Sequence, residues 1–253
     1  MKAGSQPVCF NRIGSAEMSA FASAFRTACR ALKKRHPLVN RFKLANIMKR
    51  KRVARLKRRR PETETRHLVV LDIDNTLVHS ASENDPVCAH ALRPPDQILR
   101  FPGADEAFFM YKRPGLDAFI ASMRALVAET GLRLGVWTAA HPVYARKVLS
   151  AIWPAWRQET FFFSSRKACT WLSPRVCVKE LGLLPRCYST LLVDDSIDTY
   201  SYNTATGHAV WNIAPFTADE PELTHELAEV DDYIHAVLAG SRRFECCPHL
   251  AQS

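Results

Sequence analysis

Residues 68–80 read Leu-Val-Val-Leu-Asp-Ile-Asp-Asn-Thr-Leu-Val-His-Ser, an apolar run followed at once by two carboxylates, Asp72 and Asp74. Such a run is typical of a buried parallel strand, and open α/β sheets bind ligands at the carboxyl ends of these strands. Two carboxylates at that position can divide the work of phosphoryl transfer, because one can attack phosphorus while the other protonates the leaving oxygen. A strand followed by a simple Asx turn is the alternative interpretation.

The chain after residue 66 alternates between short apolar runs and amphipathic segments. Strands are predicted at residues 107–111, 132–137, 161–163, 189–193 and 209–213, and helices from residue 116, over 144–152 and over 220–238. Residues 80–105 are predicted to form a loop because they are rich in Pro and other turn residues. The alternation predicts an α/β fold of three layers, a parallel sheet with helices on both faces. The short segments 80–110 and 153–178 predict only small cap insertions.

Three of the predicted strands end in small polar or acidic residues. These ends carry Asp72 with Asp74, then Thr138, then Asp194 with Asp195. In a parallel sheet such ends share one edge, so their side chains can converge. Carboxylates alone would repel a phosphate, whereas a Mg²⁺ ion held by oxygen ligands would remove that repulsion. The pattern therefore predicts a magnesium site at this edge.

Lys179, between the last two of these strand ends, is a candidate for binding the phosphoryl group. Its ammonium can stabilise charge that develops on the transferred group. The Thr138 hydroxyl and nearby backbone N–H groups can hold another phosphate oxygen. Taken singly, Lys179 is more often a solvated side chain and Thr138 more often a helix cap. The prediction of a phosphate site therefore depends on the order of all these residues along one α/β chain.

Five stretches of the chain, residues 72–80, 111–119, 136–145, 166–181 and 191–196, resemble motifs of one known family. They include the Leu-Val-His-Ser tail of the first stretch and the Lys-Arg-Pro of the second. The chain resembles a haloacid dehalogenase superfamily phosphatase, and within that superfamily the NLI-interacting-factor-like group, which includes the RNA polymerase II C-terminal-domain phosphatases. The resemblance covers about residues 66–238.

The resemblance implies a role for each candidate residue. Asp72 would be the nucleophile that forms an aspartyl-phosphate, and Asp74 the general acid and then the base, with its backbone carbonyl reaching the metal. Thr138 and Lys179 would hold the phosphoryl oxygens. The implied Mg²⁺ ligands are four acidic residues: Asp72, Asp74, Asp194 and Asp195.

The chain departs from the family pattern in two places. The family usually has Asp-Asn-Ser-Pro where this chain has Asp194, Asp195, Ser196 and Ile197. The extra carboxylate of Asp195 would either tighten Mg²⁺ binding or raise the pKa of a neighbouring carboxyl. Residues 200–208 also differ from the usual Pro-Glu-Asn pattern, so substrate contacts of the family are not expected to transfer there.

The charge of the chain is divided unevenly. Residues 1–60 contain 18 Lys/Arg and one acid, Glu17, for a net charge of +17, whereas residues 61–253 carry −7. Residues 15–35 have apolar residues at helical spacing, which predicts an amphipathic helix, and residues 49–52 and 57–60 form two basic clusters. The clusters fit a bipartite nuclear-import signal or a contact with nucleic-acid phosphates. A solvated linker and a mitochondrial-targeting segment are the alternatives.

Three further expectations follow from composition. The eight cysteines include no C-x-x-C pair and no zinc-type spacing, which favours reduced thiols in the cytosol or nucleus. No apolar run approaches the length of a membrane span, so no transmembrane segment is expected. The predicted parts are a basic arm at 1–60, a phosphatase domain at 66–238 and a tail at 239–253.

The expected function is a Mg²⁺-dependent phosphatase that acts on phosphoserine or phosphothreonine in a protein substrate, with the nucleus as its location and the cytoplasm or mitochondrion as alternatives. A non-catalytic binding module of the same fold and a nucleic-acid end phosphatase are the competing hypotheses. Turnover on a phosphopeptide and on a 3′-phosphorylated oligonucleotide would separate the three.

Overall fold

The computed structural model describes residues 66–101, 106–219, 225–240 and 242–245. The basic arm with its predicted helix, the boundary at 61–65 and residues 246–253 lie outside the described residues. All described residues belong to one of the two units into which the chain divides, residues 47–247.

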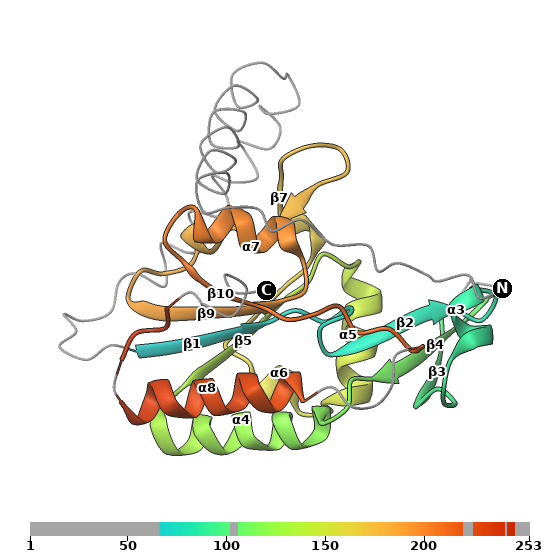
Figure 1. Cartoon of the computed structure of the whole chain (residues 1–253), viewed down its shortest axis with the longest axis horizontal. Helices are drawn as coiled ribbons and strands as arrows, with labels where there is room; N and C mark the ends of the chain where they lie inside the picture. Colours follow the sequence, from blue (N-terminus) through green and yellow to red (C-terminus); the bar gives the residue numbers. More distant parts are fainter. Residues whose placement is uncertain (1–65, 102–105, 220–224, 241, 246–253) are drawn as a thin grey trace, which may run out of the picture. The chain divides into compact units, whose positions relative to one another are not determined.

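Five parallel strands form the main sheet, in the order β10-β9-β1-β5-β6 (Figure 1). They are β1 (Arg66–Leu71), β5 (Arg133–Trp137), β6 (Phe162–Ser164), β9 (Tyr188–Asp194) and β10 (Ala209–Asn212). The central strands are nearly continuous apolar runs, as expected where both faces of a sheet are covered. The parallel sheet predicted from the sequence is confirmed.

The register of the sheet aligns the strand ends that carry the candidate residues. Leu71 of β1 lies opposite Val136 of β5 and Val193 of β9. Asp72, Thr138 and Asp194 therefore emerge at the same edge, one or two residues beyond these paired positions.

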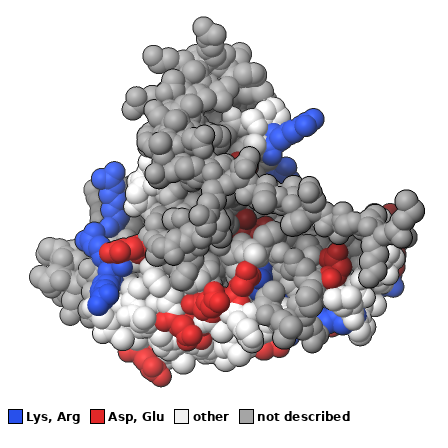
Figure 2. All heavy atoms as spheres, viewed as in Figure 1, with Lys and Arg blue, Asp and Glu red and all other residues white. Residues whose placement is uncertain are grey.

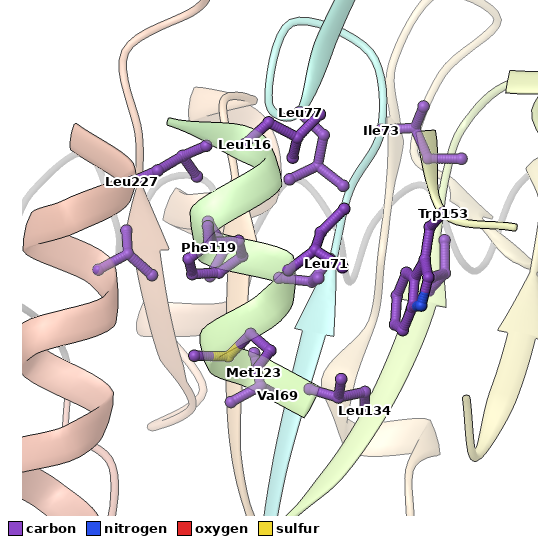
Figure 3. Close-up of a cluster of buried hydrophobic side chains, with 14 of the residues drawn as sticks. Val69, Leu71, Ile73, Leu77, Leu116, Phe119, Met123, Leu134, Trp153 and Leu227 are labelled. Carbon is purple, nitrogen blue, oxygen red and sulfur yellow. The ribbon is translucent and has the colours of Figure 1, made fainter. Parts of the chain in front are cut away.

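One face of the sheet is covered by α4 (Leu116–Thr130), α5 (Pro142–Ile152), the short α6 (Trp156–Glu159) and α8 (Glu226–Ala239). Val69 and Leu71 of β1 point to this face, where Phe119 and Met123 of α4 pack against them (Figure 3). The apolar residues of α4 recur at the helical spacing that produces one buried stripe.

The opposite face is covered by α7 (Ile197–Thr204) and by the segment that precedes β9. Leu68 and Val70, which alternate with the residues that face α4, pack here with Leu192 and Val210. In Figure 1, α7 lies on the opposite side of the sheet from α4 and α8. The three-layer α/β architecture is thus confirmed.

The prediction of a loop over residues 80–105 is wrong in three places, where the structure has strands or a helix. β2 (Val78–Ser82), β3 (Gln97–Arg100) and β4 (Ala107–Lys112) form a separate antiparallel sheet in the order β2-β4-β3. A short helix, α3 (Pro86–His90), connects β2 to β3, and the Asp85 carboxylate caps it by accepting a hydrogen bond from Val87 N at 2.9 Å. β2 and β3 are polar strands held by pairing with the apolar β4, and such tertiary pairing overrides local propensity.

Smaller differences concern element ends and short elements. α7 and the two-residue strands β7 (Thr170–Trp171) and β8 (Cys177–Val178) were not among the predicted elements. The last helix begins at Glu226, and residues 220–224, which the prediction included, lie outside the described residues. Residues 242–245, within the predicted tail, contact the domain, since Phe244 is buried and its N–H donates to Ser189 Oγ at 2.8 Å.

Acidic side chains gather on the surface in the region of α4 and α8 (Figure 2). α8 contains four acidic residues and no Lys or Arg, consistent with the negative charge of this part of the sequence. Within the described ranges, none of the helices has the length and apolar character needed to cross a bilayer. The four described cysteines are free thiols.

Candidate active site

Three carboxylates meet at the carboxyl edge of the main sheet. Each of Asp72, Asp194 and Asp195 offers one oxygen, and these oxygens lie within 4.8 Å of one another. Asp72 follows β1, and its N–H continues the sheet by donating to Val193 O at 3.0 Å. Asp194 ends β9 and Asp195 follows it, so the strand ends themselves position the cluster.

Lys179 is buried between two of these carboxylates. Its Nζ lies 2.8 Å from Asp72 Oδ1 and 2.6 Å from Asp194 Oδ2. The two carboxylates raise the pKa of Lys179 despite its burial, so the side chain is a permanent cation. Asp72 Oδ1 forms this ion pair but accepts no well-aligned hydrogen bond.

Asn203 of α7 fixes the backbone around Lys179. Its Nδ2 donates to Lys179 O at 2.7 Å, and its Oδ1 accepts from Leu181 N at 2.9 Å. Asn203 is fully buried. These bonds hold β8 and the following turn against α7, which directs the lysine toward the sheet edge.

Asp74 lies apart from the three clustered carboxylates and has its own partners. The Tyr144 hydroxyl donates to Asp74 Oδ1 at 2.5 Å, and Thr138 Oγ1 lies 3.5 Å from Asp74 Oδ2. Burial raises the pKa of Asp74, and the hydrogen bond from Tyr144 opposes that rise. A carboxyl group with a raised pKa is suited to proton transfer.

The turn between Asp72 and β2 separates the two aspartates. The N–H groups of Leu77 and Val78 both donate to Ile73 O, at 2.8 and 3.1 Å. Asn75 has a φ of 57°, and asparagine tolerates this left-handed conformation better than most residues. The chain therefore reverses at Asn75, and Asp74 comes to lie at the start of this turn.

The Thr138 hydroxyl lies at the same edge, buried at the end of β5. Its Oγ1 accepts a hydrogen bond from Ala140 N at 2.9 Å. The 3.5 Å distance to Asp74 is long for a hydroxyl donor, so this hydrogen bond is weak.

Asp195 is held by two residues whose sequence context gave no signal for this role. Thr76 Oγ1 accepts from Asp195 N at 3.1 Å and lies 3.3 Å from Asp195 Oδ1, to which it donates. Asn212 Nδ2 donates to the backbone oxygens of Asp194 and Asp195 at 3.1 and 3.0 Å. Thr76 and Asn212 are far from Asp195 in sequence or on another strand, so only the folded chain shows these contacts.

The donor set fits a divalent cation. The three clustered carboxylates, Asp72, Asp194 and Asp195, lie around one buried cation, Lys179, and Asp74 lies beside them. Burial raises the pKa of Asp72, and the neighbouring Asp194 and Asp74 raise it further; burial also raises the pKa of Asp195. Carboxylate oxygens are the ligands that Mg²⁺ prefers, and the three clustered oxygens are near enough to one another to bind the same ion.

The structure thus brings all six predicted residues to one edge of the sheet. Asp72, Asp194 and Asp195 converge around Lys179, whereas Asp74 and Thr138 lie together beside Tyr144. Tyr144 is the neighbour that sequence reasoning missed as a site residue. The signal available for it was its position in the first turn of α5, the helix that follows the Thr138 strand end.

The model of the NLI interacting factor-like phosphatase family matches residues 67–242. Among solved structures, the RNA polymerase II CTD phosphatase Fcp1 of fission yeast, bound to beryllium fluoride, has 18% sequence identity and a TM-score of 0.45 over 77% of this chain and 55% of its own. A second structure of Fcp1, an essential RNA polymerase II CTD phosphatase, has 20% identity and a TM-score of 0.44 over 76% and 55%.

The chain therefore spans 55% of the length of each of these two solved structures. No curated protein matches it. The family match covers well over half of the chain and includes every residue of the site described above. On this match, the chain belongs to the family of NLI interacting factor-like phosphatases.

Proposed function

We propose that the chain is a Mg²⁺-dependent phosphatase that hydrolyses phosphoserine or phosphothreonine in a protein substrate through an aspartyl-phosphate. The observation that supports this most directly is the convergence of Asp72, Asp194 and Asp195 around the buried Lys179. A purely structural ion pair would need one carboxylate for one lysine. The excess carboxylates in a buried place are costly unless a further cation balances them.

In the proposed first step, an oxygen of Asp72 attacks phosphorus. The bond between phosphorus and the substrate oxygen breaks, and Asp74 donates its proton to that leaving oxygen. In the second step, water attacks phosphorus, Asp74 takes a proton from the water, and the bond between phosphorus and Asp72 breaks to release phosphate. The chemistry requires Asp74 to be protonated first, which its raised pKa favours.

Lys179 and Thr138 would bind the phosphoryl oxygens during both steps. Lys179 is charged and immobilised by its ion pairs, so it needs no rearrangement to face developing charge. Asp72, Asp194 and Asp195, with the backbone carbonyl of Asp74, would hold the Mg²⁺. A bound Mg²⁺ would neutralise the carboxylates and polarise a phosphoryl oxygen.

A protein substrate is proposed because the insertions around the site are small. The antiparallel sheet β2-β4-β3 and the hairpin β7-β8 are the additions near the main sheet in the described part of the chain. We expect them to leave room for a phosphorylated residue within a longer chain, and a phosphopeptide like the C-terminal domain of RNA polymerase II is the first substrate to test. The domain would span residues 66–238, with a basic arm at 1–60 that directs the protein to the nucleus.

The decisive experiment compares the wild type with Asp72→Asn on a phosphopeptide library and an aryl phosphate, with Mg²⁺ present and then chelated. We expect turnover by the wild type that requires Mg²⁺, and none by the variant, while circular dichroism shows the same fold. Full residual activity in Asp72→Asn would reject the nucleophile. Tight phosphopeptide binding without turnover in the wild type would support a binding module, and selective turnover of a 3′-phosphorylated oligonucleotide would support an end phosphatase.

A further inference from the structure

Arg113 is the largest fully buried side chain of the described residues, with 1% of its surface exposed. Its Nε donates to Thr76 O at 2.7 Å, and its Nη2 donates to Asn75 O at 2.7 Å and Ala214 O at 2.5 Å. Its Nη1 forms an ion pair with Glu226. A guanidinium is costly to bury unless its donors are bonded and its charge is paired, and both conditions are met here.

These contacts join three segments that are distant in sequence. They are the turn after Asp74, the chain that follows β10, and the first turn of α8. Phe216 strengthens the junction, since its N–H donates to Asn75 O at 2.8 Å and its ring centre lies 5.4 Å from the Arg113 guanidinium carbon. Arg113 N also donates to Leu77 O at 2.9 Å. The backbone of the turn is therefore held by the Arg113 side chain together with the N–H groups of Arg113 and Phe216.

Two of the three carbonyls that the Arg113 side chain binds, those of Asn75 and Thr76, belong to residues directly connected to the site. Asn75 follows Asp74 in the chain. Thr76 contacts Asp195 through both of the hydrogen bonds of its hydroxyl, with Asp195 N and Asp195 Oδ1. A shift of this turn would therefore move both Asp74 and Asp195.

We infer that Arg113 is a positioning residue of the active site, which acts through Asn75 and Thr76 to set the relative placement of Asp74 and Asp195. Its side-chain hydrogen bonds and its ion pair go to the turn, to Ala214 and to Glu226, so its role differs from that of the residues that would contact phosphate. This inference rests on the proposed function. The planar fork of a guanidinium can serve several carbonyls at fixed angles, whereas a lysine ammonium cannot reproduce that geometry.

The first test replaces Arg113 with Lys in the full chain. We expect kcat on the best phosphopeptide to fall by about 10- to 100-fold while KM changes little, because a displaced general acid affects the transition state more than binding. The Mg²⁺ dissociation constant, measured by calorimetry, should rise together with the loss of kcat. Arg124→Lys is the matched control, since Arg124 on α4 pairs with Glu159 of α6 and neither is a candidate site residue.

Two further variants separate positioning from folding. In Arg113→Ala, added methylguanidinium should restore part of kcat, whereas methylammonium at the same concentration should not. Glu226→Gln keeps the shape of the arginine partner and removes its charge, so it should lower kcat less than Arg113→Lys does. If neither arginine variant folds, an unchanged kcat and Mg²⁺ dissociation constant in Glu226→Gln would overturn the inference.

The outcomes for this inference and for the proposed function are distinct. A soluble Arg113→Lys whose kcat and Mg²⁺ dissociation constant both match those of the wild type would overturn the positioning role. A wild type without turnover on any phosphate ester would reject the proposed function. In that case Mg²⁺ calorimetry on the wild type and Arg113→Lys would still decide the inference, with equal affinities counting against it.

Discussion

At the scale of single residues, the carboxylates of the site differ in the side chains that contact them. Asp72 and Asp194 share Lys179, whereas Asp74 accepts its hydrogen bond from a neutral hydroxyl, that of Tyr144. Burial raises the pKa of both carboxyls, and this rise is opposed at Asp72 by the charge of Lys179 and at Asp74 first by the hydrogen bond from Tyr144. The adjacent cation favours the charged form that the proposed nucleophile needs, and the neutral hydroxyl beside Asp74 suits the proposed proton donor.

Asp195 provides the first residue-scale prediction. Asp195→Asn keeps an oxygen ligand and the contact with Thr76 but removes one negative charge, so the Mg²⁺ concentration for half-maximal activity should rise on the order of tenfold. At saturating Mg²⁺, kcat should stay within a few-fold of the wild type. A Mg²⁺ titration of activity measures the half-maximal Mg²⁺ concentration and kcat at saturation. Asp198→Asn, an exposed acid on α7, is the control, and an unchanged titration in Asp195→Asn would show that its charge does not serve the metal.

Tyr144 leads to a second prediction at the residue scale, on the pH dependence of activity. Its hydrogen bond lowers the pKa of Asp74, against the rise caused by burial, so Tyr144→Phe should raise that pKa further. Asp74 would then remain protonated to higher pH. For an alkyl phosphate, whose leaving oxygen needs a proton, the decline of kcat/KM with rising pH should move to higher pH in the variant. Tyr233→Phe, which loses a remote bond to Glu245, should leave the profile unchanged, and a shift to lower pH in Tyr144→Phe would contradict the argument.

The position of the main site residues could be predicted because they follow apolar runs directly. A parallel sheet places such residues at one edge whatever the details of packing. The contacts of Thr76, Tyr144 and Arg113 could not be predicted in the same way, because each depends on how segments more than 35 residues apart approach one another. The local pattern of apolar and polar residues carries no information on how distant segments pack together.

At the scale of elements, the close pairing of β5 with β6 depends on Gly135. Gly135 lies opposite Phe162, and a Cβ at this glycine would lie 2.3 Å from the Phe162 ring. Gly135→Ala should therefore lower the free energy of unfolding by about 1–3 kcal/mol, as measured by urea denaturation, and Phe162→Ala added to it should recover part of the loss. Gly182→Ala is the control, because its nearest neighbour would be at 3.7 Å, and equal stability of the two glycine variants would reject the steric explanation.

Elements with a clear apolar pattern were predictable, and elements held by pairing or capping were not. β1, β5 and β9 are apolar runs that end in polar residues. α7 reads Ile-Asp-Thr-Tyr-Ser-Tyr-Asn-Thr, a polar sequence of low helical tendency. It is a helix because Ser196 caps it at Thr199 N and because Asn203 is bonded within the core. β2 and β3 likewise exist because β4 supplies their hydrogen-bond partners.

At the scale of the whole molecule, the charge of the site links metal binding to stability. The three clustered carboxylates around one lysine should make the folded chain bind Mg²⁺ and the unfolded chain bind it far less. Mg²⁺ at 100 times its dissociation constant should then stabilise the fold by about 2.7 kcal/mol. Thermal unfolding with Mg²⁺ and with a chelator measures this, and Asp194→Asn should show a smaller difference. Identical melting curves for the wild type in the two conditions would argue against a metal at this edge.

The separation of charge along the chain gives the last prediction. Removing residues 1–60 changes the net charge from +10 to −7, while every residue of the candidate site remains. Turnover of an aryl phosphate should therefore persist within a few-fold, whereas retention on DNA at low salt, which depends on lysine and arginine contacts with phosphates, should be lost. Measuring turnover and DNA retention across a salt series separates the arm from the catalytic domain.

If the truncated chain instead loses turnover of a 3′-phosphorylated oligonucleotide but keeps that of a phosphopeptide, the arm recruits a nucleic-acid substrate. If a fluorescent fusion that lacks only residues 49–60 still enters the nucleus, the basic clusters do not act as its import signal.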